Sequence, residues 1–463
     1  MALAAVLLLA QASAPSWGDV QRRAETSVVS VRSRVRVALG RDEVGSLEGS
    51  GFVVDLDRRL VATNRHVAGE GVVLDLEVRF DNGETSPARR VWADPLHDFA
   101  FLEFDPLPPE AAVTELPLRE KSVGLGEDVL MVGNNGGLAA TVLSGRISNL
   151  AAVWEQDPGV AYLQTSIASA AGSSGSPILD RRGAVVGMQS AHDVNHSYAL
   201  PADYLAGALA NLRQRRPPPR GTLGLRMRPA QLFEMVSAGV ASARVEAGER
   251  PAPLAAVADG VVPDSPAWEK IRPGDLVLAI DGREAADGRE IERVLDAAVD
   301  REVGVSIVRD GVASTVRLTV ADLNRDVPQT LVLSSGACFH DVGYELRARA
   351  DLRRRGAFVS CVAPGSAAEA AGLERDDLVV AVGGKPVEDA ASIARILAAA
   401  RDGERLTLVV RRPSSFDSAT RTLALVIDRV WDPSRILVRR RSPDGTAAAQ
   451  VWEEEAPPAS RPR

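Results

Sequence analysis

The second half of the chain contains an internal repeat, which restricts the possible folds more than any other feature of the sequence. Ser265–Gly282 matches Ser366–Gly384, with an offset of 101 residues at the serines and 102 at the final glycines. Each copy predicts a short helix, a turn, a strand and a glycine turn, followed by a longer helix and a further strand. Solenoid repeats are only about 20–50 residues long. The longer period therefore predicts two copies of one small α+β domain.

The first half of the chain has a different pattern, in which short apolar runs alternate with turn residues from about residue 25 to about residue 205. Many short strands with regular turns are typical of a β-barrel or a β-sandwich. Examples are Ser27–Val31, Gly51–Val54, Val72–Phe80, Ala100–Phe104 and Val129–Val132. The period becomes helical near Tyr204–Leu212, and Arg213–Arg220 then interrupts it. Consecutive prolines favour an extended spacer, so we predict a linker at residues 214–220.

The composition excludes several classes of protein. With 463 residues, the chain is long enough for about three domains. Its net charge of -8 argues against a nucleic-acid partner, which usually requires a basic surface. The sequence has no His/Cys cluster with metal-ligand spacing and no glycine-rich phosphate loop, so we expect no metal and no cofactor. Cys338 and Cys361 are the two cysteines; we expect unpaired buried thiols, with a Cys338–Cys361 pair as the alternative.

The N-terminus resembles a targeting segment. Ala2–Ala10 is apolar but too short to span a bilayer, and the small residues up to Ala14 fit a cleavage site. We therefore expect a leader at residues 1–14 and an exported protein, located in a bacterial periplasm or outside the cell. A wrongly assigned start or a short disordered leader is the alternative. No other segment is long and apolar enough to predict an integral membrane segment.

The segment Gly172–Pro177 (GSSGSP) carries the strongest chemical signal and lies between two apolar runs. A nucleophilic serine needs an exposed hydroxyl on a tight turn, and backbone N–H groups directed at the developing oxyanion. The flanking glycines permit such a turn. Ser174 is thus the candidate nucleophile, with the N–H groups of Gly172 and Ser174 as the oxyanion hole. The alternative is a plain Ser/Gly turn between two strands.

Two further residues complete a possible triad. His66 follows an apolar strand, and a histidine is able to take a proton from serine near neutral pH. Asp98 precedes the apolar run Ala100–Phe104, where a carboxylate would orient the imidazole. Asp94 and His97 lie nearby and are the alternatives. The order His, Asp, Ser along the chain is that of chymotrypsin and differs from the orders in subtilisin and the α/β-hydrolases.

These motifs together resemble the HtrA (Deg) family of serine proteases. The matching segments are Gly49–Val53, Thr63–Val67, Asp94–Leu102, Gln164–Thr165 and Gly172–Pro177. Ser173 and Ser176 stand where the usual family signature has Asn and Gly, and this variant is similar to the branch of fungal nuclear HtrA-like proteases. The resemblance covers roughly residues 20 to 430. It implies a mainly β chain with a chymotrypsin-like double β-barrel, followed by two PDZ domains that bind peptide C-termini by strand addition.

The resemblance also divides the chain. It implies a protease domain at residues 17–213, PDZ domains at 221–322 and 330–430, and a hairpin-like extension with a disordered tail at 431–463. In the first PDZ domain, Leu223, Gly224 and Leu225 are similar to the family's carboxylate-binding loop; in the second, Gly336–Phe339 is the candidate. The family commonly forms homotrimers through N-terminal aromatic residues. Trp17 is the candidate for that contact, or it caps the barrel.

The resemblance places the substrate pocket as well. Ala168 corresponds to part of the pocket for the side chain before the scissile bond, and Met188, Ser190 and Ala191 are expected to form another wall. These residues favour cleavage after small to medium aliphatic side chains. We expect an ATP-independent endopeptidase for unfolded, damaged or C-terminally exposed polypeptides. The alternatives are a non-proteolytic chaperone or binding protein on a protease fold, and a narrowly specific processing protease.

Overall fold

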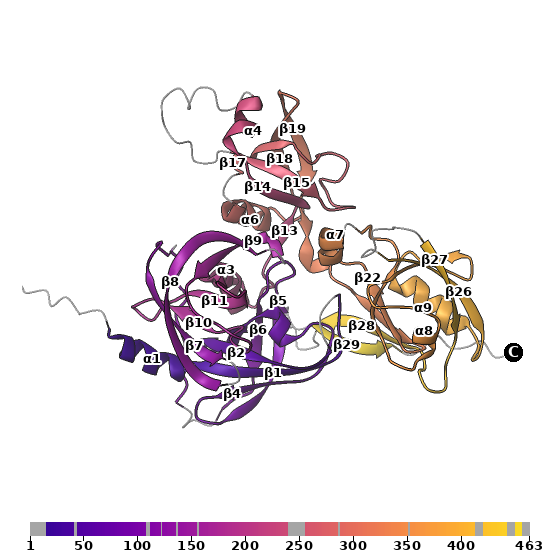
Figure 1. The fold of residues 1–463 in the computed structure, drawn as a ribbon, viewed down its shortest axis with the longest axis horizontal. Helices are drawn as coiled ribbons and strands as arrows, with labels where there is room; N and C mark the ends of the chain where they lie inside the picture. Colours follow the sequence, from indigo (N-terminus) through magenta and orange to yellow (C-terminus); the bar gives the residue numbers. More distant parts are fainter. Residues whose placement is uncertain are drawn as a thin grey trace, which may run out of the picture.

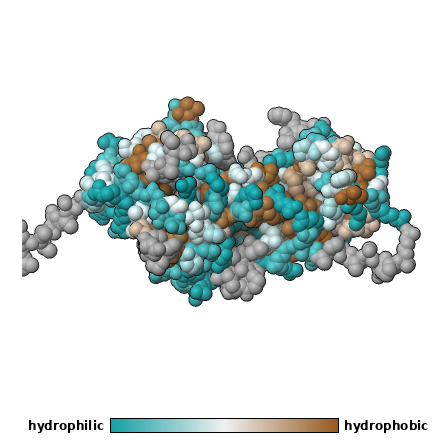
Figure 2. All heavy atoms as spheres, turned by 90° about the horizontal axis from the view of Figure 1, so that it is seen from below, coloured by the Kyte–Doolittle hydropathy of each residue, from teal (hydrophilic) through white to brown (hydrophobic). Residues whose placement is uncertain are grey.

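The structure is a computed structural model in which two β-barrels are followed by two smaller β-rich domains (Figure 1). Figure 2, turned by 90°, shows hydrophobic residues interspersed among hydrophilic ones on the face that it presents. No helix within the described ranges is sufficiently long and apolar to span a bilayer. The structure describes residues 15–40, 44–107, 112–121, 123–135, 138–154, 157–238, 255–285, 288–350, 352–412, 420–441 and 450–455.

The first six strands close into a barrel in the order β1-β2-β3-β6-β5-β4. Every second residue of β1 is buried, which is the pattern of a strand with one face on a core. β3 pairs with β6, so Thr63 and Ala100 lie opposite each other. The elements are β1 (Val28–Val37), β2 (Gly45–Asp55), β3 (Leu60–Thr63), α2 (Arg65–Ala68), β4 (Val72–Phe80), β5 (Thr85–Ala93) and β6 (Ala100–Phe104).

The next six strands close into a second barrel in the order β10-β11-β12-β9-β8-β7. Its strands are β7 (Asp128–Asn135), β8 (Leu138–Trp154), β9 (Asp157–Thr165), β10 (Pro177–Leu179), β11 (Val185–His192) and β12 (Ser197–Pro201). One apolar cluster joins residues of both barrels with α1 (Trp17–Glu25) and α3 (Ala202–Arg213). The predicted double barrel is confirmed, and the two barrels share part of their core.

The first PDZ domain follows the linker. Its main sheet has the order β14-β15-β16-β18-β19, so β14 is an edge strand. Ile291 and Leu295 of helix α6 are buried in its core. The elements are β13 (Gly221–Thr222), β14 (Leu225–Pro229), α4 (Leu232–Ser237), β15 (Ala256–Val261), β16 (Leu276–Ile280), β17 (Arg283–Glu284), α6 (Gly288–Ala297), β18 (Glu302–Arg309), β19 (Val312–Thr319), β20 (Ala321–Asp322) and η1 (Leu323–Arg325).

The second PDZ domain is built on a larger sheet with the order β27-β26-β24-β23-β22-β21-β28-β29. Its last two strands come from the C-terminal extension and lie between this domain and the barrels in Figure 1. The turn predicted at 442–445 and the disordered tail predicted at 457–463 lie outside the described residues. The elements are β21 (Thr330–Ser334), β22 (Ala337–Asp341), α7 (Tyr344–Ala350), β23 (Ala357–Val362), α8 (Ala367–Ala370), β24 (Leu378–Val382), β25 (Lys385–Pro386), α9 (Ala390–Ala399), β26 (Arg405–Arg411), β27 (Thr420–Val426), β28 (Arg435–Arg441) and β29 (Gln450–Glu455).

The expectation of two unpaired thiols is wrong, because Cys338 and Cys361 form a disulfide. The two residues are direct partners in the antiparallel register of β22 and β23, with Cα atoms 5.0 Å apart. Cross-strand neighbours at this spacing bring two sulfur atoms within bonding distance. The sequence did not reveal this pairing because the register of the two strands is a long-range property.

Candidate active site

His66 and Asp98 lie together where β3 ends beside the start of β6. His66 is in α2, which begins two residues after β3, and Asp98 is two residues before β6. Asp98 Oδ2 is 2.7 Å from His66 Nδ1, and Asp98 Oδ1 accepts the backbone N–H of His66 at 3.0 Å. This carboxylate therefore contacts both the ring and the main chain of the histidine, which fixes the orientation of the imidazole.

The environment of Asp98 keeps it ionised. Burial alone would raise the pKa of its carboxyl group, but the charge and hydrogen bonds of His66 and the charge of Arg65 together lower that pKa below its ordinary value. The His66 side chain is 46% exposed, whereas that of Asp98 is 21% exposed. An ionised, partly enclosed aspartate beside an accessible imidazole is the arrangement that stabilises an imidazolium ion during proton transfer.

The turn that carries Ser174 belongs to the second barrel but is attached to the first. The backbone N–H of Ser50 in β2 donates to Ser174 O at 2.7 Å, and Ser50 Oγ donates to Gly172 O at 3.1 Å. Gly175 has a φ of 88°, and a Cβ at this position would overlap the backbone oxygen of Ser50. Glycine is therefore required at 175 both for its backbone conformation and for this close approach.

Two backbone amides of this turn are available to a ligand. The amides of Ser173, Gly175 and Ser176 donate to protein carbonyl groups. Within the described ranges, the amides of Gly172 and Ser174 donate to no protein oxygen. They are the pair that the sequence predicts for the oxyanion hole, and their assignment to that role stays a prediction.

Asn64 is a residue at this site that the sequence reasoning missed. Its Nδ2 donates to Asp98 O at 2.7 Å and to Ser190 Oγ at 2.9 Å. It thereby joins the aspartate loop of the first barrel to β11 of the second. Its position two residues before His66 was a signal in the sequence. The contact between Asn64 and Ser190, however, depends on how the two barrels pack together.

The predicted pocket residues have different environments. Ala168 is exposed, and Ala191 is buried in β11. Met188 is fully buried in the apolar cluster that the two barrels share. The hydroxyl of Ser190 binds Asn64 and donates to Met188 O. Their assignment to a substrate pocket stays a prediction.

The two departures from the usual signature have structural explanations. Ser173 closes the turn, because its Oγ donates to Ala170 O at 2.5 Å. Ser176 Oγ is buried, and in the described part of the chain it has no hydrogen-bond partner. A Cβ at Gly133 would overlap this hydroxyl, so glycine at 133 makes room for serine at 176.

We therefore expect Ser176→Ala to stabilise the protein by about 1 kcal/mol, because it removes a buried hydroxyl without a partner and keeps the Cβ. Denaturant unfolding measures this change. Gly133→Ala should lower the free energy of unfolding by about 1–3 kcal/mol through overpacking. Adding Ser176→Gly to this variant should restore part of the lost stability, because it removes the side chain that the new Cβ overlaps. If Gly133→Ala were neutral, the crowding between the two positions would be disproved.

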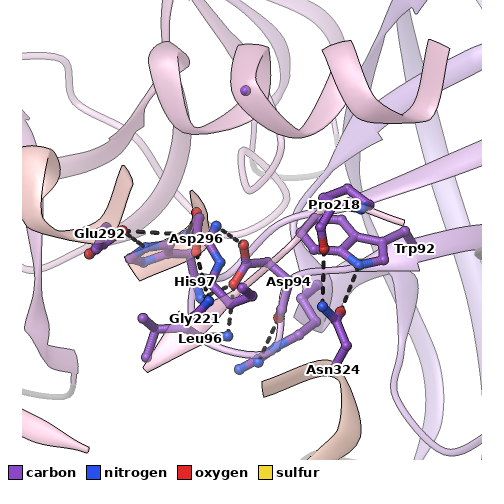
Figure 3. Close-up of polar contacts among 12 residues, drawn as sticks. Trp92, Asp94, Leu96, His97, Pro218, Gly221, Glu292, Asp296 and Asn324 are labelled. Atoms are coloured by element: carbon purple, nitrogen blue, oxygen red, sulfur yellow. Dashed lines mark hydrogen bonds and ion pairs between the residues drawn. The ribbon is translucent and has the colours of Figure 1, made fainter. Parts of the chain in front are cut away.

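Asp94 and His97, the alternatives to the triad, lie in a polar cluster with Glu292 and Asp296 of α6 (Figure 3). Asp94 is fully buried and forms an ion pair with Arg220 of the linker, and it accepts the N–H groups of Leu96 and His97, each at 2.8 Å. Burial would raise the pKa of Asp94, but Arg220 and these N–H groups lower it below the ordinary value. Asp94 therefore anchors the linker and supports the loop that ends at Asp98.

His97 faces the first PDZ domain. Its Nε2 lies 2.8 Å from Glu292 Oε2 of α6, and its ring is 4.3 Å from that of Tyr204. Arg220 also contacts Asp296 at 3.2 Å. Burial raises the pKa of Asp296 to about 6. These contacts connect α6 with the loop before Asp98. Arg220, the last residue of the predicted spacer, is buried among them.

The predicted peptide-binding loop of the first PDZ domain is well ordered by its own contacts. Leu223 is buried in the domain core, and Leu225 is partly buried against the same core. Gly224 has a φ of 74°, and its N–H donates to Thr222 Oγ1 at 2.9 Å. The role of these three residues in carboxylate binding stays a prediction. Among the described residues no group of side chains is arranged to hold a metal ion.

Three family models match the chain. Residues 49–188 match a trypsin-like peptidase domain, and residues 221–320 and 358–412 match PDZ domains. The pro-apoptotic serine protease NMA111 of Vanderwaltozyma polyspora is 28% identical over 453 residues, 95% of this chain and 45% of its own. The protein of the same name from Aspergillus clavatus is 30% identical over 459 residues, 96% of this chain and 44% of its own. The chain thus spans less than half the length of these relatives.

Solved structures resemble part of the fold. The HtrA-type protease AlgW with a tripeptide aligns with a TM-score of 0.52 and 22% sequence identity, over 66% of this chain and 97% of its own. AlgW with a decapeptide aligns with a TM-score of 0.51 and 22% identity, over 66% of this chain and 99% of its own. Identity at this level shows a shared fold.

The comparisons contradict the expected location. The relatives that match nearly the whole chain are fungal proteins named for apoptosis, a process inside the cell, so the prediction of a bacterial periplasmic or extracellular protein is wrong. The leader predicted at residues 1–14 lies outside the described residues. An apolar run followed by small residues was a weak signal, because short apolar stretches also occur without a targeting function.

Proposed function

Because the chain belongs to the HtrA family of serine proteases, we propose that it is a serine endopeptidase with Ser174 as nucleophile. His66 is the general base in this proposal, and Asp98 orients it. The observation that carries the proposal is the 2.7 Å contact between Asp98 Oδ2 and His66 Nδ1. The turn that carries Ser174 is hydrogen-bonded to Ser50 of β2. The amides of Gly172 and Ser174 supply the oxyanion hole.

These groups support acyl transfer in two steps. His66 takes the proton from Ser174 Oγ as the oxygen attacks the scissile carbonyl carbon, and the amides of Gly172 and Ser174 stabilise the resulting oxyanion. The imidazolium then gives this proton to the leaving amine, and the C–N bond breaks. In the second step, His66 activates water, which releases the acyl group from Ser174. Asp98 remains ionised throughout and stabilises the imidazolium.

A fluorophosphonate probe tests the proposal directly, because it reacts with an activated serine. We expect the purified chain to degrade casein and to be labelled at Ser174, as mapped by mass spectrometry. Labelling at a different serine, with loss of casein degradation, would contradict the assignment. A folded chain with neither labelling nor degradation would favour the non-proteolytic chaperone or binding protein.

We further propose that the substrates are unfolded or damaged polypeptides with exposed C-termini, cut after small to medium aliphatic residues. The absence of an acidic side chain at Ala168 supports this preference, since a basic side chain would require a buried carboxylate. A narrowly specific processing protease is the second candidate, supported by the name of the relatives, which refers to one process. A library of peptide substrates separates the two: broad cleavage favours the first, and cleavage of one sequence favours the second.

The proposed homotrimer rests on analogy with the family. Trp17 is packed against the apolar cluster of the two barrels, and the Arg181 guanidinium lies 4.8 Å from the centre of its ring. This environment supports the alternative in which Trp17 caps its own barrel. Sedimentation of the purified chain as a monomer at micromolar concentration would rule out the trimer.

A further inference from the structure

The two PDZ domains have equivalent turns at the start of the strand that would receive a peptide. Gly224 precedes β14 with a φ of 74°, and Gly336 precedes β22 with a φ of 83°. A Cβ at Gly224 would overlap the Cβ of Ser265, and a Cβ at Gly336 would overlap the Cβ of Ser366. These two serines open the matching segments of the internal repeat. β14 and β22 are therefore corresponding strands.

In the second PDZ domain, the outer edge of β22 is already paired. β21 runs antiparallel to β22, from Leu331 opposite His340 to Ser334 opposite Ala337, and it ends at the turn that contains Gly336. A peptide bound by strand addition pairs with the same edge, and its C-terminus lies at this turn. β21 thus has both the place and the direction of a bound peptide.

The contacts of β21 support this comparison. Val332 is fully buried in one apolar cluster with Ile393 and Leu397 of α9. In a PDZ groove, the ligand lies between the receiving strand and such a helix, and an aliphatic side chain fills the pocket. On its other side, β21 pairs with β28, from Thr330 opposite Val438 to Leu333 opposite Arg435. Displacing β21 would therefore break two ladders of backbone hydrogen bonds.

In the first PDZ domain, the strand before the turn, β13, pairs with β20 and not with β14. β14 is at the edge of its sheet, and no strand of the described ranges pairs with its outer side. The residues ahead of its turn include Pro217, Pro218 and Pro219, and proline has no N–H to donate to a neighbouring strand. Helix α6 carries the same apolar residues as α9, because Ile291 and Leu295 match Ile393 and Leu397 at an offset of 102 residues.

We propose that β21 fills the peptide-binding groove of the second PDZ domain in cis, and that extended polypeptides with a free, aliphatic C-terminus bind only at β14 in the first PDZ domain. This assignment rests on the proposed function for the peptide-binding role, and it adds which domain binds and why the other does not. The second PDZ domain then serves as a structural platform that connects the protease barrel with the C-terminal strands.

Amide hydrogen exchange on the full chain tests both halves of the proposal. The probe is an eight-residue peptide that ends in valine with a free carboxylate, and its amidated form is the control. Without peptide, we expect the amides of residues 337–341 to exchange much more slowly than those of 225–228. With saturating free-acid peptide, protection should increase in 225–228 and remain unchanged in 337–341. The amidated peptide should cause no change.

Matched substitutions provide the second measurement. Ile291→Ala should weaken binding of the free-acid peptide about tenfold, because it removes one wall of the pocket. Ile393→Ala should lower the stability of the second domain but leave the peptide affinity within about twofold. Increased protection at 337–341 on adding peptide, or equal losses of affinity for both variants, would overturn the proposal. If no peptide binds, the peptide-binding role of the first domain is disproved. Rapid exchange at 337–341 in the free chain would separately disprove that β21 fills the groove of the second domain.

Discussion

Replacing Ser174 with alanine is expected to lower kcat for peptide hydrolysis by about a millionfold, the scale of loss when a triad serine is removed from an unrelated serine protease. Without the hydroxyl, His66 has no proton to accept from a nucleophile, and the oxyanion hole alone gives only weak catalysis. A chromogenic peptide assay on the purified variant measures the effect. The fold should be retained, because Ser174 lies in a turn held by its backbone contacts with Ser50.

Two controls accompany this measurement. The variant should keep the thermal unfolding midpoint of the unsubstituted chain and lose labelling by a fluorophosphonate. It should also bind a free-acid peptide unchanged, because the peptide-binding strand β14 belongs to a separate domain. Undiminished hydrolysis by a pure Ser174→Ala sample would disprove the nucleophile assignment.

The second large effect is expected from Asp98→Asn. The amide keeps the shape of the carboxylate but favours the wrong tautomer of His66 and does not stabilise its cation. We expect activity at neutral pH to fall about 10⁴-fold, as this change does in another Ser-His-Asp protease. The stability of the fold should change little, because an asparagine oxygen still accepts the N–H of His66.

Asp94→Asn is the matched control for Asp98→Asn, and it should have the opposite effects. It removes the charge that pairs with Arg220 in a fully buried site, and breaking a buried ion pair lowers the free energy of unfolding by about 3–5 kcal/mol. Activity per folded molecule should fall less than about tenfold. Chemical denaturation and active-site titration together separate these effects. A larger loss of activity for Asp94→Asn than for Asp98→Asn would show that the two aspartates were assigned the wrong way round.

Local sequence patterns predicted the parts of the fold that depend on neighbouring residues. Alternating apolar residues predicted the barrel strands, because one face of each strand lies on a core, and the repeat predicted the second PDZ-like domain. The pairing of Cys338 with Cys361 was only the alternative to unpaired thiols, and the contact between Asn64 and Ser190 was missed. Both depend on register or packing between segments far apart in the chain, which a periodicity in sequence does not encode.

The linker shows the same limit. Three prolines predicted an extended spacer, and residues 216–220 form no helix or strand, but the prolines gave no indication that Arg220 would enter a buried cluster of carboxylates. Residues flanking the triad were also ambiguous in sequence, because Asp94 and Asp98 have the same chemistry and lie in the same short loop between β5 and β6. The direction in which each carboxylate points separates them, and this depends on the position of Arg220 and α6.

The place of β21 between β22 and β28 has a consequence for shortened versions of this protein. A fragment that stops at residue 430 would retain β21 but lack β28, so one side of β21 would present unpaired backbone groups beside the apolar side chains of Leu331 and Leu333. Such exposed strand edges template aggregation between molecules. During synthesis on the ribosome, the same edge stays uncovered until residue 441 has emerged, so this sheet is completed after both barrels and the first PDZ domain.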